Sequence, residues 1–490
     1  MRLSMLALVG AIAGCLSAPA AYAQIAPGQS APVQPTAYEY NSYYAQQDDE
    51  MAGAKERGVE GEPDPQAAQA PAEEEEESFG NGCGTLLNPY CCLGDQWKIF
   101  DSECLECRGI NVTGWLAMNP FTWNTTNPAD RFNGPVTFTD RSNDFQLNQL
   151  YLFAEKATDT GGCGWDWGYR ADFMGGTDYR FTTAAGLETH GYYQFPKVST
   201  QRFYGYAFPQ FYLEAAYNDL KVKVGHFYAP VGYEVVTATG NFFPNLPYTF
   251  QYGEPFTFTG VLATYTAGEN LTLIGGVTHG WDNFDNSANP HAGGIVGFTE
   301  TFEDGAAFAA TFTFGVEPNS FNALLQGVTF SERYLQTLVY SRPLASISDR
   351  LTYVAQSDFG YQNDVFGAGT TDAYWYGLNQ YLFYKVSDCM SYGIRAEWFR
   401  DEDGARVGGF LGTTPDGSTR GLSTSRFGYP GSFYEVTLGA NYKYSANTTF
   451  RPYVRFDWFS GTSPAANLRP FDGGNGNSQT LLGFDVIMLY

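Results

Sequence analysis

From Ile110 to the last residue, the sequence repeats segments in which apolar and polar side chains alternate, each segment ending in a turn. Such alternation is typical of β-strands, because successive side chains of a strand point to opposite faces of the sheet. The pattern predicts sixteen strands, at residues 110–119, 143–156, 165–175, 206–217, 220–229, 256–266, 270–281, 292–302, 306–316, 332–342, 350–359, 373–386, 391–400, 432–443, 449–459 and 480–490. The chain from 110 to 490 is therefore expected to be all-β.

The two faces of these predicted strands differ in charge. Between 450 and 458 one face carries Phe450, Val454, Phe456 and Trp458, and the other carries Arg451, Arg455 and Asp457. Charged side chains must reach water, and at the depth of a membrane that water lies inside a barrel. A soluble sandwich with one wet face predicts the same alternation, so the pattern alone leaves both folds open.

The connections between the predicted strands favour the barrel. Short connections fall at 218–219, 267–269, 303–305, 387–390 and 444–448, and long ones at 120–142, 176–205, 230–255, 317–331, 401–431 and 460–479. Outer-membrane barrels sort their connections in this way, with short turns at the periplasmic end and long loops outside the cell. Together with the export signal described below, this predicts a transmembrane antiparallel β-barrel over 110–490, with both termini in the periplasm.

The last stretch, 479–490, predicts how the sheet closes. Its apolar face carries Leu482, Phe484, Val486, Met488 and Tyr490. A terminal strand leaves an open edge, which pairing with the strand near 110–119 removes. We expect the apolar row to face lipid, the Tyr490 ring to sit at the membrane interface and Asp485 to face the lumen.

Composition excludes several classes of protein. Charged residues make up 16% of the chain, below the quarter or so of an average soluble domain. No apolar run beyond the N-terminus is long enough for a membrane-spanning helix. The net charge of −25 is concentrated, since residues 39–77 hold 13 acidic residues against two basic ones. The remainder is mildly acidic, which argues against nucleic-acid binding.

The N-terminus predicts export. Residues 1–23 combine Arg2, an apolar centre and the sequence Ala-Tyr-Ala at 21–23, as in a secretory signal peptide cleaved after Ala23. The sequence Ile-Ala-Gly-Cys at 12–15 offers a second interpretation, a lipoprotein signal that leaves Cys15 lipidated. In both cases the protein reaches a compartment that permits disulfides.

Two further segments precede the strands. Residues 24–78 are rich in Ala, Pro, Gln and Glu and are expected to be disordered. Residues 79–109 are predicted to form a Cys-rich periplasmic element, whose disulfide candidates are Cys83, Cys91, Cys92, Cys104 and Cys107. Zinc binding or redox chemistry at the last two remains an alternative. Cys163 and Cys389 fall in predicted periplasmic turns, where either is placed to pair with this element.

Two stretches carry a family resemblance: GIRAEWFRDEDGAR at 393–406 and FYAPVGYEVVTATGNFFPNLPYTFQYGEPFTFTG at 227–260. With the segment 162–178, they make residues 110–490 resemble the putative β-barrel porin, OmpL-like family of bacterial outer membranes. The resemblance implies a channel-forming barrel in contact with outer-membrane lipid. It also implies that Phe484 and Tyr490 act as the signal for the barrel-assembly machinery. General porins are often trimers, which leaves a homo-trimer open.

The connection at 230–255 follows the fifth predicted strand, and in general porins, which this topology resembles, that loop folds into the lumen. We expect an eyelet there, with acids on the loop and other charged side chains on the wall. The candidates are Glu234 and Glu254 on the loop, and Arg170, Asp172, Arg395, Glu397, Arg451 and Arg455 on the wall. Because both signs of charge are present, we expect weak ion selectivity. An ion pair within the wall, such as Arg395 with Glu397, remains an alternative role.

The sequence selects no catalytic, metal or cofactor site. The four histidines, at positions 190, 226, 279 and 291, lack the spacing of metal ligands. No combination of Ser, His and acid stands out as a hydrolytic triad. We therefore predict a non-enzymatic pore for passive diffusion of small hydrophilic solutes or ions. The alternative is a non-transporting barrel whose long loops, such as 176–205 and 401–431, serve adhesion or envelope structure.

Overall fold

The computed structural model describes residues 93–490, except residues 101, 130, 190–202, 286–288, 320–328, 367–368, 408–427 and 463–468. The predicted signal segment, the acidic segment and the first part of the Cys-rich element lie outside the described residues. Within the described part of the chain, no helix is long and apolar enough to cross a membrane.

The described strands belong to one antiparallel sheet. They are β1 (Asn111–Asn124), β2 (Gln146–Lys156), β3 (Trp165–Gly176), β4 (Gly205–Ala207), β5 (Phe211–Tyr217), β6 (Leu220–Tyr228), β7 (Thr257–Thr266), β8 (Leu271–Thr278), β9 (Gly293–Thr301), β10 (Ala307–Pro318), β11 (Phe330–Pro343), β12 (Leu351–Gln362), β13 (Ala373–Ser387), β14 (Met390–Asp401), β15 (Gly431–Ser445), β16 (Thr448–Gly461) and β17 (Ser478–Leu489). The helical elements are short: α3 (Glu103–Glu106), η1 (Asp178–Phe181), η2 (Ala238–Gly240), η3 (Thr249–Gly253) and η5 (Asp472–Gly474).

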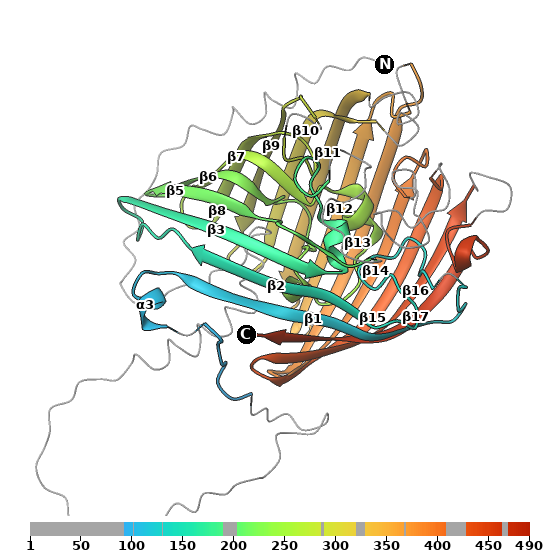
Figure 1. The fold of residues 1–490 in the computed structure, drawn as a ribbon, viewed down its shortest axis with the longest axis horizontal. Helices are drawn as coiled ribbons and strands as arrows, with labels where there is room; N and C mark the ends of the chain where they lie inside the picture. Colours follow the sequence, from blue (N-terminus) through green and yellow to red (C-terminus); the bar gives the residue numbers. More distant parts are fainter. Residues whose placement is uncertain are drawn as a thin grey trace, which may run out of the picture. The chain divides into compact units, whose positions relative to one another are not determined.

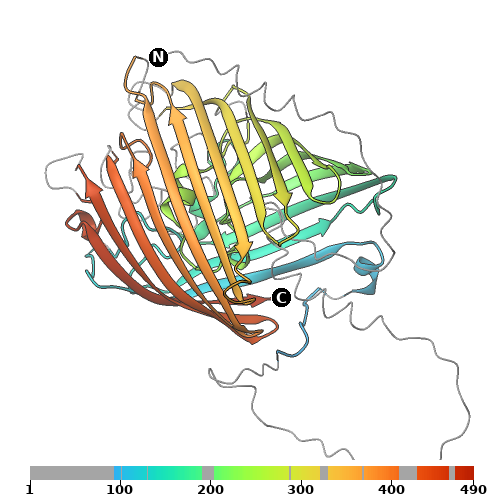
Figure 2. The ribbon, with the colours of Figure 1, turned by 180° about the vertical axis from the view of Figure 1, so that it is seen from behind.

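The sheet closes into a barrel because β1 pairs with β2 on one side and with β17 on the other. β4 and β5 pair with consecutive parts of β3, so they are two pieces of one strand interrupted at 208–210. The seventeen labelled strands, with β4 and β5 counted as one, are therefore the sixteen predicted strands. Figures 1 and 2 show these strands from opposite sides of the barrel. The prediction of a closed sixteen-stranded barrel is confirmed.

The barrel wall separates charged from apolar side chains as the alternation predicts. On β16, Arg451, Arg455 and Asp457 are buried, whereas Phe456 and Trp458 on the opposite face are 40% and 41% exposed. The buried face of this strand contacts a loop inside the barrel. The exposed aromatic face is therefore the outer surface, which suits contact with lipid.

The connections sort by length as predicted. Strand pairs β5–β6, β13–β14 and β15–β16 are joined by two residues each, at 218–219, 388–389 and 446–447. Asn218 has a φ of 52°, the left-handed conformation that tight hairpin turns favour. The long connections alternate with these turns and include 125–145, 177–204, 229–256, 402–430 and 462–477.

The last strand pairs with the first strand as predicted. Trp115 of β1 lies opposite Leu489 of β17. Leu482 is 49% exposed and Asp485 is buried, which matches the two predicted faces of this strand.

The position of Tyr490 differs from the prediction that its ring is exposed to lipid. The side chain is only 9% exposed, and its hydroxyl donates a hydrogen bond of 2.7 Å to the backbone carbonyl of Tyr151 on β2. Gly114 makes room for it, since a Cβ there would come within 2.9 Å of the Tyr490 hydroxyl. The backbones of Gly114 and Tyr490 also exchange hydrogen bonds of 3.1 and 3.0 Å. The C-terminal residue therefore joins β17 to both β1 and β2.

The described cysteines of the Cys-rich element contradict the disulfide prediction for two positions. Cys104 and Cys107 are exposed free thiols at the short helix α3. The Cys107 thiol donates to the backbone carbonyl of Cys104 at 3.3 Å, so it is directed at that carbonyl. Cys83, Cys91 and Cys92 lie outside the described residues.

The contacts of Tyr490 predict that its ring contributes more than its hydroxyl to barrel closure. Tyr490→Phe removes one hydrogen bond and should cost about 1 kcal/mol of stability. Tyr490→Ala also removes the packed ring and should cost about 3–5 kcal/mol and lower the yield of folded barrel. Heat-modifiable mobility on gels and thermal unfolding measure both effects. Tyr444→Ala is the control, because that aromatic ring is 64% exposed; equal losses in Tyr444→Ala and Tyr490→Ala would contradict the prediction.

Candidate constriction site

The connection between β6 and β7, residues 229–256, is the candidate constriction loop, and it folds into the barrel (Figure 1). Its contacts lie on strands far from β6 and β7 along the sheet. The Trp375 indole on β13 donates to the Gly253 carbonyl at 3.1 Å. The Tyr248 hydroxyl donates to Asp457 on β16 at 2.6 Å. The loop therefore crosses the lumen, as expected from the resemblance to general porins.

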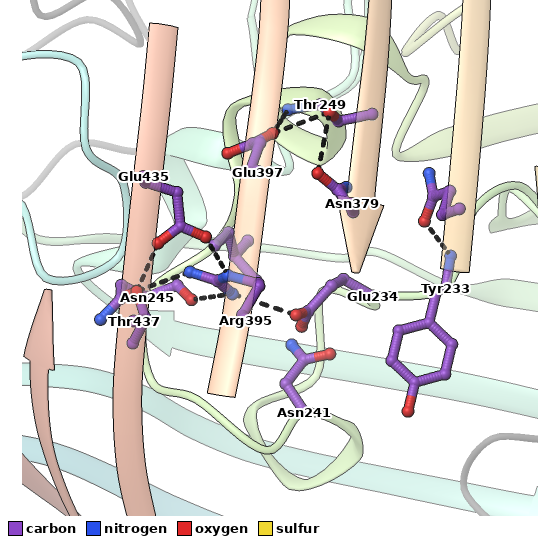
Figure 3. Close-up of polar contacts among 12 residues, drawn as sticks. Tyr233, Glu234, Asn241, Asn245, Thr249, Asn379, Arg395, Glu397, Glu435 and Thr437 are labelled. Carbon is purple, nitrogen blue, oxygen red and sulfur yellow. Dashed lines mark hydrogen bonds and ion pairs between the residues drawn. The ribbon is translucent and has the colours of Figure 1, made fainter. Parts of the chain in front are cut away.

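Arg395 on β14 is the centre of the contact between this loop and the wall (Figure 3). One guanidinium nitrogen donates to Glu234 at 3.0 Å and to the Asn245 carbonyl at 2.9 Å, and another donates to the Asn245 side-chain oxygen at 2.8 Å. Its Nε binds Glu435 on β15. The guanidinium is fully buried, so it lies between a loop carboxylate and a wall carboxylate without access to bulk water.

The side chain of Arg451 binds backbone carbonyls of the loop. Its guanidinium makes two hydrogen bonds to Asp485 on β17, of 2.8 and 2.5 Å, and donates to the loop carbonyls of Ala238 and Asn241 at 2.9 and 2.6 Å. The wall carboxylate fixes the plane of the guanidinium, and the remaining N–H groups bind loop carbonyls that have no partner in a strand.

Arg455, on the same inner face of β16, repeats this arrangement. It pairs with Asp457 at 2.8 Å and donates to the Leu246 carbonyl at 2.7 Å and to the Asn245 side-chain oxygen at 3.0 Å. Asn245 thus accepts hydrogen bonds from both Arg395 and Arg455. The two arginines hold the same loop residue from two different strands.

Glu397 contacts the loop directly. Its carboxylate accepts hydrogen bonds from the backbone N–H groups of Tyr248 and Thr249 at 2.7 and 2.6 Å, and from the Thr249 hydroxyl at 2.7 Å. Arg395 and Glu397 therefore do not form the ion pair within the wall that was the alternative role for these residues. The carboxylate is occupied by donors at the start of η3, and Arg395 pairs with Glu234 and Glu435 instead.

Glu254 belongs to a second contact, on β12. The Gln356 amide donates to Glu254 at 2.5 Å and to Asp358 at 2.9 Å, which brings two carboxyl groups to one nitrogen. Burial raises the pKa of Glu254 well above its ordinary value, and the neighbouring Asp358 raises it further. Gly232 allows the close approach of the chain here, since a Cβ would come within 2.2 Å of a Glu254 oxygen.

Arg170 and Asp172 on β3 form a separate group. They pair with each other at 2.8 Å, and Arg170 also lies 3.5 Å from Glu155 on β2. Asp172 accepts hydrogen bonds from Tyr151 on β2 and from Gln210 at the break between β4 and β5. These partners belong to the wall rather than to the constriction loop. The structure thus places six of the eight candidates at the loop–wall contact and two elsewhere.

Several residues of this contact were not among the predicted candidates. Glu435, Asp457 and Asp485 lie on inward faces that alternation identifies, so the pattern offered a signal for them. Asn245 and Gln356 had no such signal, because amides on a loop or strand are common and their role depends on which side chains meet them.

Comparison with known proteins identifies the barrel. The family described as "Putative beta-barrel porin-2, OmpL-like" matches residues 109–490. Curated proteins give no match. OprB of Pseudomonas putida superposes with a TM-score of 0.50 and 11% identity, covering 79% of this chain and 95% of that chain. DcaP of Acinetobacter baumannii superposes with a TM-score of 0.46 and 10% identity, covering 78% of this chain and 97% of that chain. An anion-selective porin from Comamonas acidovorans superposes with a TM-score of 0.45 and 10% identity, covering 78% of this chain and 99% of that chain.

At 11% identity the likeness to OprB shows a shared fold alone. The family match is the stronger finding, because it spans the whole barrel from before β1 to the C-terminal residue. It agrees with the resemblance carried by residues 227–260 and 393–406. The chain therefore belongs to the "Putative beta-barrel porin-2, OmpL-like" family of outer-membrane β-barrel porins.

Proposed function

We propose that this porin is a channel for passive diffusion of small hydrophilic solutes or ions, and that the loop 229–256 sets the width of the passage. Membership of a porin family supports channel formation. The observation that carries the role of the loop is its attachment across the lumen through Arg395, Arg451 and Arg455. Recordings in planar lipid bilayers test the proposal, with stable open-channel currents as the expected result.

Weak ion selectivity is part of this proposal. The charged side chains at the loop–wall contact occur as pairs of opposite sign, such as Arg395 with Glu234 and Arg451 with Asp485. Paired charges largely cancel each other's field at a distance, so they favour neither cations nor anions strongly. Reversal potentials in a salt gradient should therefore lie close to zero.

A second candidate function is a non-transporting barrel that serves adhesion or envelope structure. The burial of the loop favours it. Phe243, Tyr248 and Phe250 are at most 4% exposed and belong to three apolar clusters that reach different parts of the wall. A loop packed so completely leaves less of the cross-section for solutes. A barrel that inserts into bilayers and carries no current would favour this second function.

The proposal includes an orientation and partners. The start of β1, the end of β17 and the two-residue turns lie at one end of the barrel, and we assign this end to the periplasm because outer-membrane barrels place short turns there. Lipid contacts the outer aromatic face, and the barrel-assembly machinery recognises the last strand, with Phe484 and Tyr490 as the proposed signal. We also propose a homo-trimer, because general porins, which this topology resembles, are often trimers.

Substitution of Arg395 tests the attachment of the loop. Arg395→Ala leaves Glu234 buried without its cation and leaves Glu435 only the longer pair with Arg455, at 3.9 Å, which should cost about 3–5 kcal/mol of stability. The released loop should give larger and noisier single-channel currents than the wild-type loop. Thermal unfolding and bilayer recordings measure the two effects.

Arg400→Ala is the matched control on the same strand. Arg400 pairs with Glu402 at a partly exposed site, so its loss should cost under about 1 kcal/mol and leave the currents unchanged. Unfolding temperature and conductance that stay at wild-type values in Arg395→Ala would refute the role of this residue.

The raised pKa of Glu254 predicts that the stability of the folded loop depends on pH. Burial favours the protonated carboxyl in the folded state, so the contribution of this group to stability is present at low pH and is lost as pH rises through the raised pKa. We expect loop fluctuations, seen as current noise, to increase toward alkaline pH in the wild type. Glu254→Gln keeps the neutral form and should abolish the increase. Glu303→Gln, in an exposed turn, should behave as the wild type does; an unchanged pH response in Glu254→Gln would rule out this residue as its source.

A further inference from the structure

Two long loops, 125–145 and 177–204, meet at the end of the barrel opposite the two-residue turns. Arg180 of the second loop donates to both carboxylate oxygens of Asp140 in the first loop, at 3.0 and 2.9 Å. Every residue from 132 to 142 is buried, and the N–H of Asn133 donates to the Asp140 carbonyl at 2.9 Å. The first loop therefore folds on itself and is held against the second.

A buried arginine, Arg141, lies at this junction. The residue is 4% exposed. Its guanidinium carbon lies 4.1 Å from the ring centroid of Phe132 in the same loop and 4.9 Å from that of Phe203 in the second loop. Aromatic rings attract a cation through their faces but accept none of its N–H groups in ordinary hydrogen bonds. The N–H groups of Arg141 therefore need partners at the edges of the guanidinium.

Most of these N–H groups have no such partner. Nη2 donates to Asp144 at 3.3 Å. Nε and Nη1 are buried and have no hydrogen-bond partner within the part of the chain that the structure describes. Leaving a buried charged donor without an acceptor costs more than leaving a neutral one, so this edge of the guanidinium calls for an acceptor.

The charge of Arg141 is also only partly neutralised. Asp144 pairs with Arg131 at 3.0 Å through one oxygen and with Arg141 at 3.3 Å through the other. Arg180, by contrast, holds both oxygens of Asp140. A water molecule at Nε and Nη1 would satisfy the N–H groups but would leave the buried charge as it is. An anion satisfies both, and its hydrogen bonds to a guanidinium are charge-assisted and strong.

We propose that Arg141 binds a small oxyanion, a phosphate or a carboxylate group, through its Nε and Nη1 N–H groups at the junction of the two loops. The planar array of guanidinium N–H groups matches the spacing of oxygens in such an anion. The bound anion would stabilise the packing of Arg141 of one loop against Phe203 of the other. A free anion and the phosphate of a lipid head group share this chemistry. The inference is independent of whether the barrel conducts.

Calorimetric titration of the full-length, detergent-solubilised barrel with inorganic phosphate tests the proposal. The wild type should bind phosphate saturably, and Arg141→Gln should weaken the affinity about 10–100-fold, the loss expected for charge-assisted hydrogen bonds. Asp144→Asn should tighten binding several-fold, because it removes the carboxylate that competes for Arg141. Arg342→Gln is the matched control, an exposed arginine paired with Asp304, and should bind as the wild type does.

Native mass spectrometry of the barrel extracted from outer membranes separates the two sources of the anion. A lipid retained by the wild type and lost from Arg141→Gln would identify a head group, whereas phosphate binding without such a lipid would identify a free anion. Wild-type protein that holds neither would overturn the proposal, as would equal binding by Arg141→Gln that is folded by its heat-modifiable mobility. If Arg141→Gln does not fold, Asp144→Asn decides, and an affinity no higher than that of the wild type would count against the site.

Discussion

Closure of the sheet between β1 and β17 is the constraint on which the rest of the structure depends. Inside lipid, each backbone N–H and C=O needs a partner in the protein, and an open strand edge has none. The backbone hydrogen bonds between Gly114 and Tyr490 complete the closed ring of strands directly after β17. With sixteen strands, the ring is too wide for wall side chains alone to fill, so its interior is available to a loop.

The interior loop needs hydrogen-bond partners from the wall, because its backbone is not part of the sheet. An irregular segment inside a barrel exposes carbonyls that no strand satisfies, and those carbonyls need donors from the wall. Arg395, Arg451 and Arg455 provide them, because a guanidinium has five N–H groups and can bind a wall carboxylate and loop carbonyls together. The wall acids neutralise these arginines and fix their planes. The loop, the arginines and the acids thus form one connected network of hydrogen bonds and ion pairs.

Strand positions and faces were predictable because β-structure has a period of two residues, and charge inside a membrane barrel must face the lumen. For this reason Arg395, Arg451 and Asp485 were assigned to the inner face correctly. Their partners were not predictable in the same way. Glu397 is two residues from Arg395 on the same face, yet its oxygens are occupied by N–H groups of the loop, and Arg395 binds acids from β15 and from the loop.

The sequence by itself determined the barrel, its strand number, the sorting of its connections and the side of the wall on which each charge lies, since these follow from local alternation and turn residues. Only the tertiary structure decided which charges meet, that Tyr490 packs at the seam beside Gly114, and that Arg170 and Asp172 belong to a group apart from the loop. These outcomes depend on side chains brought together from strands and loops far apart in the chain. Local periodicity carries no information about such distant neighbours.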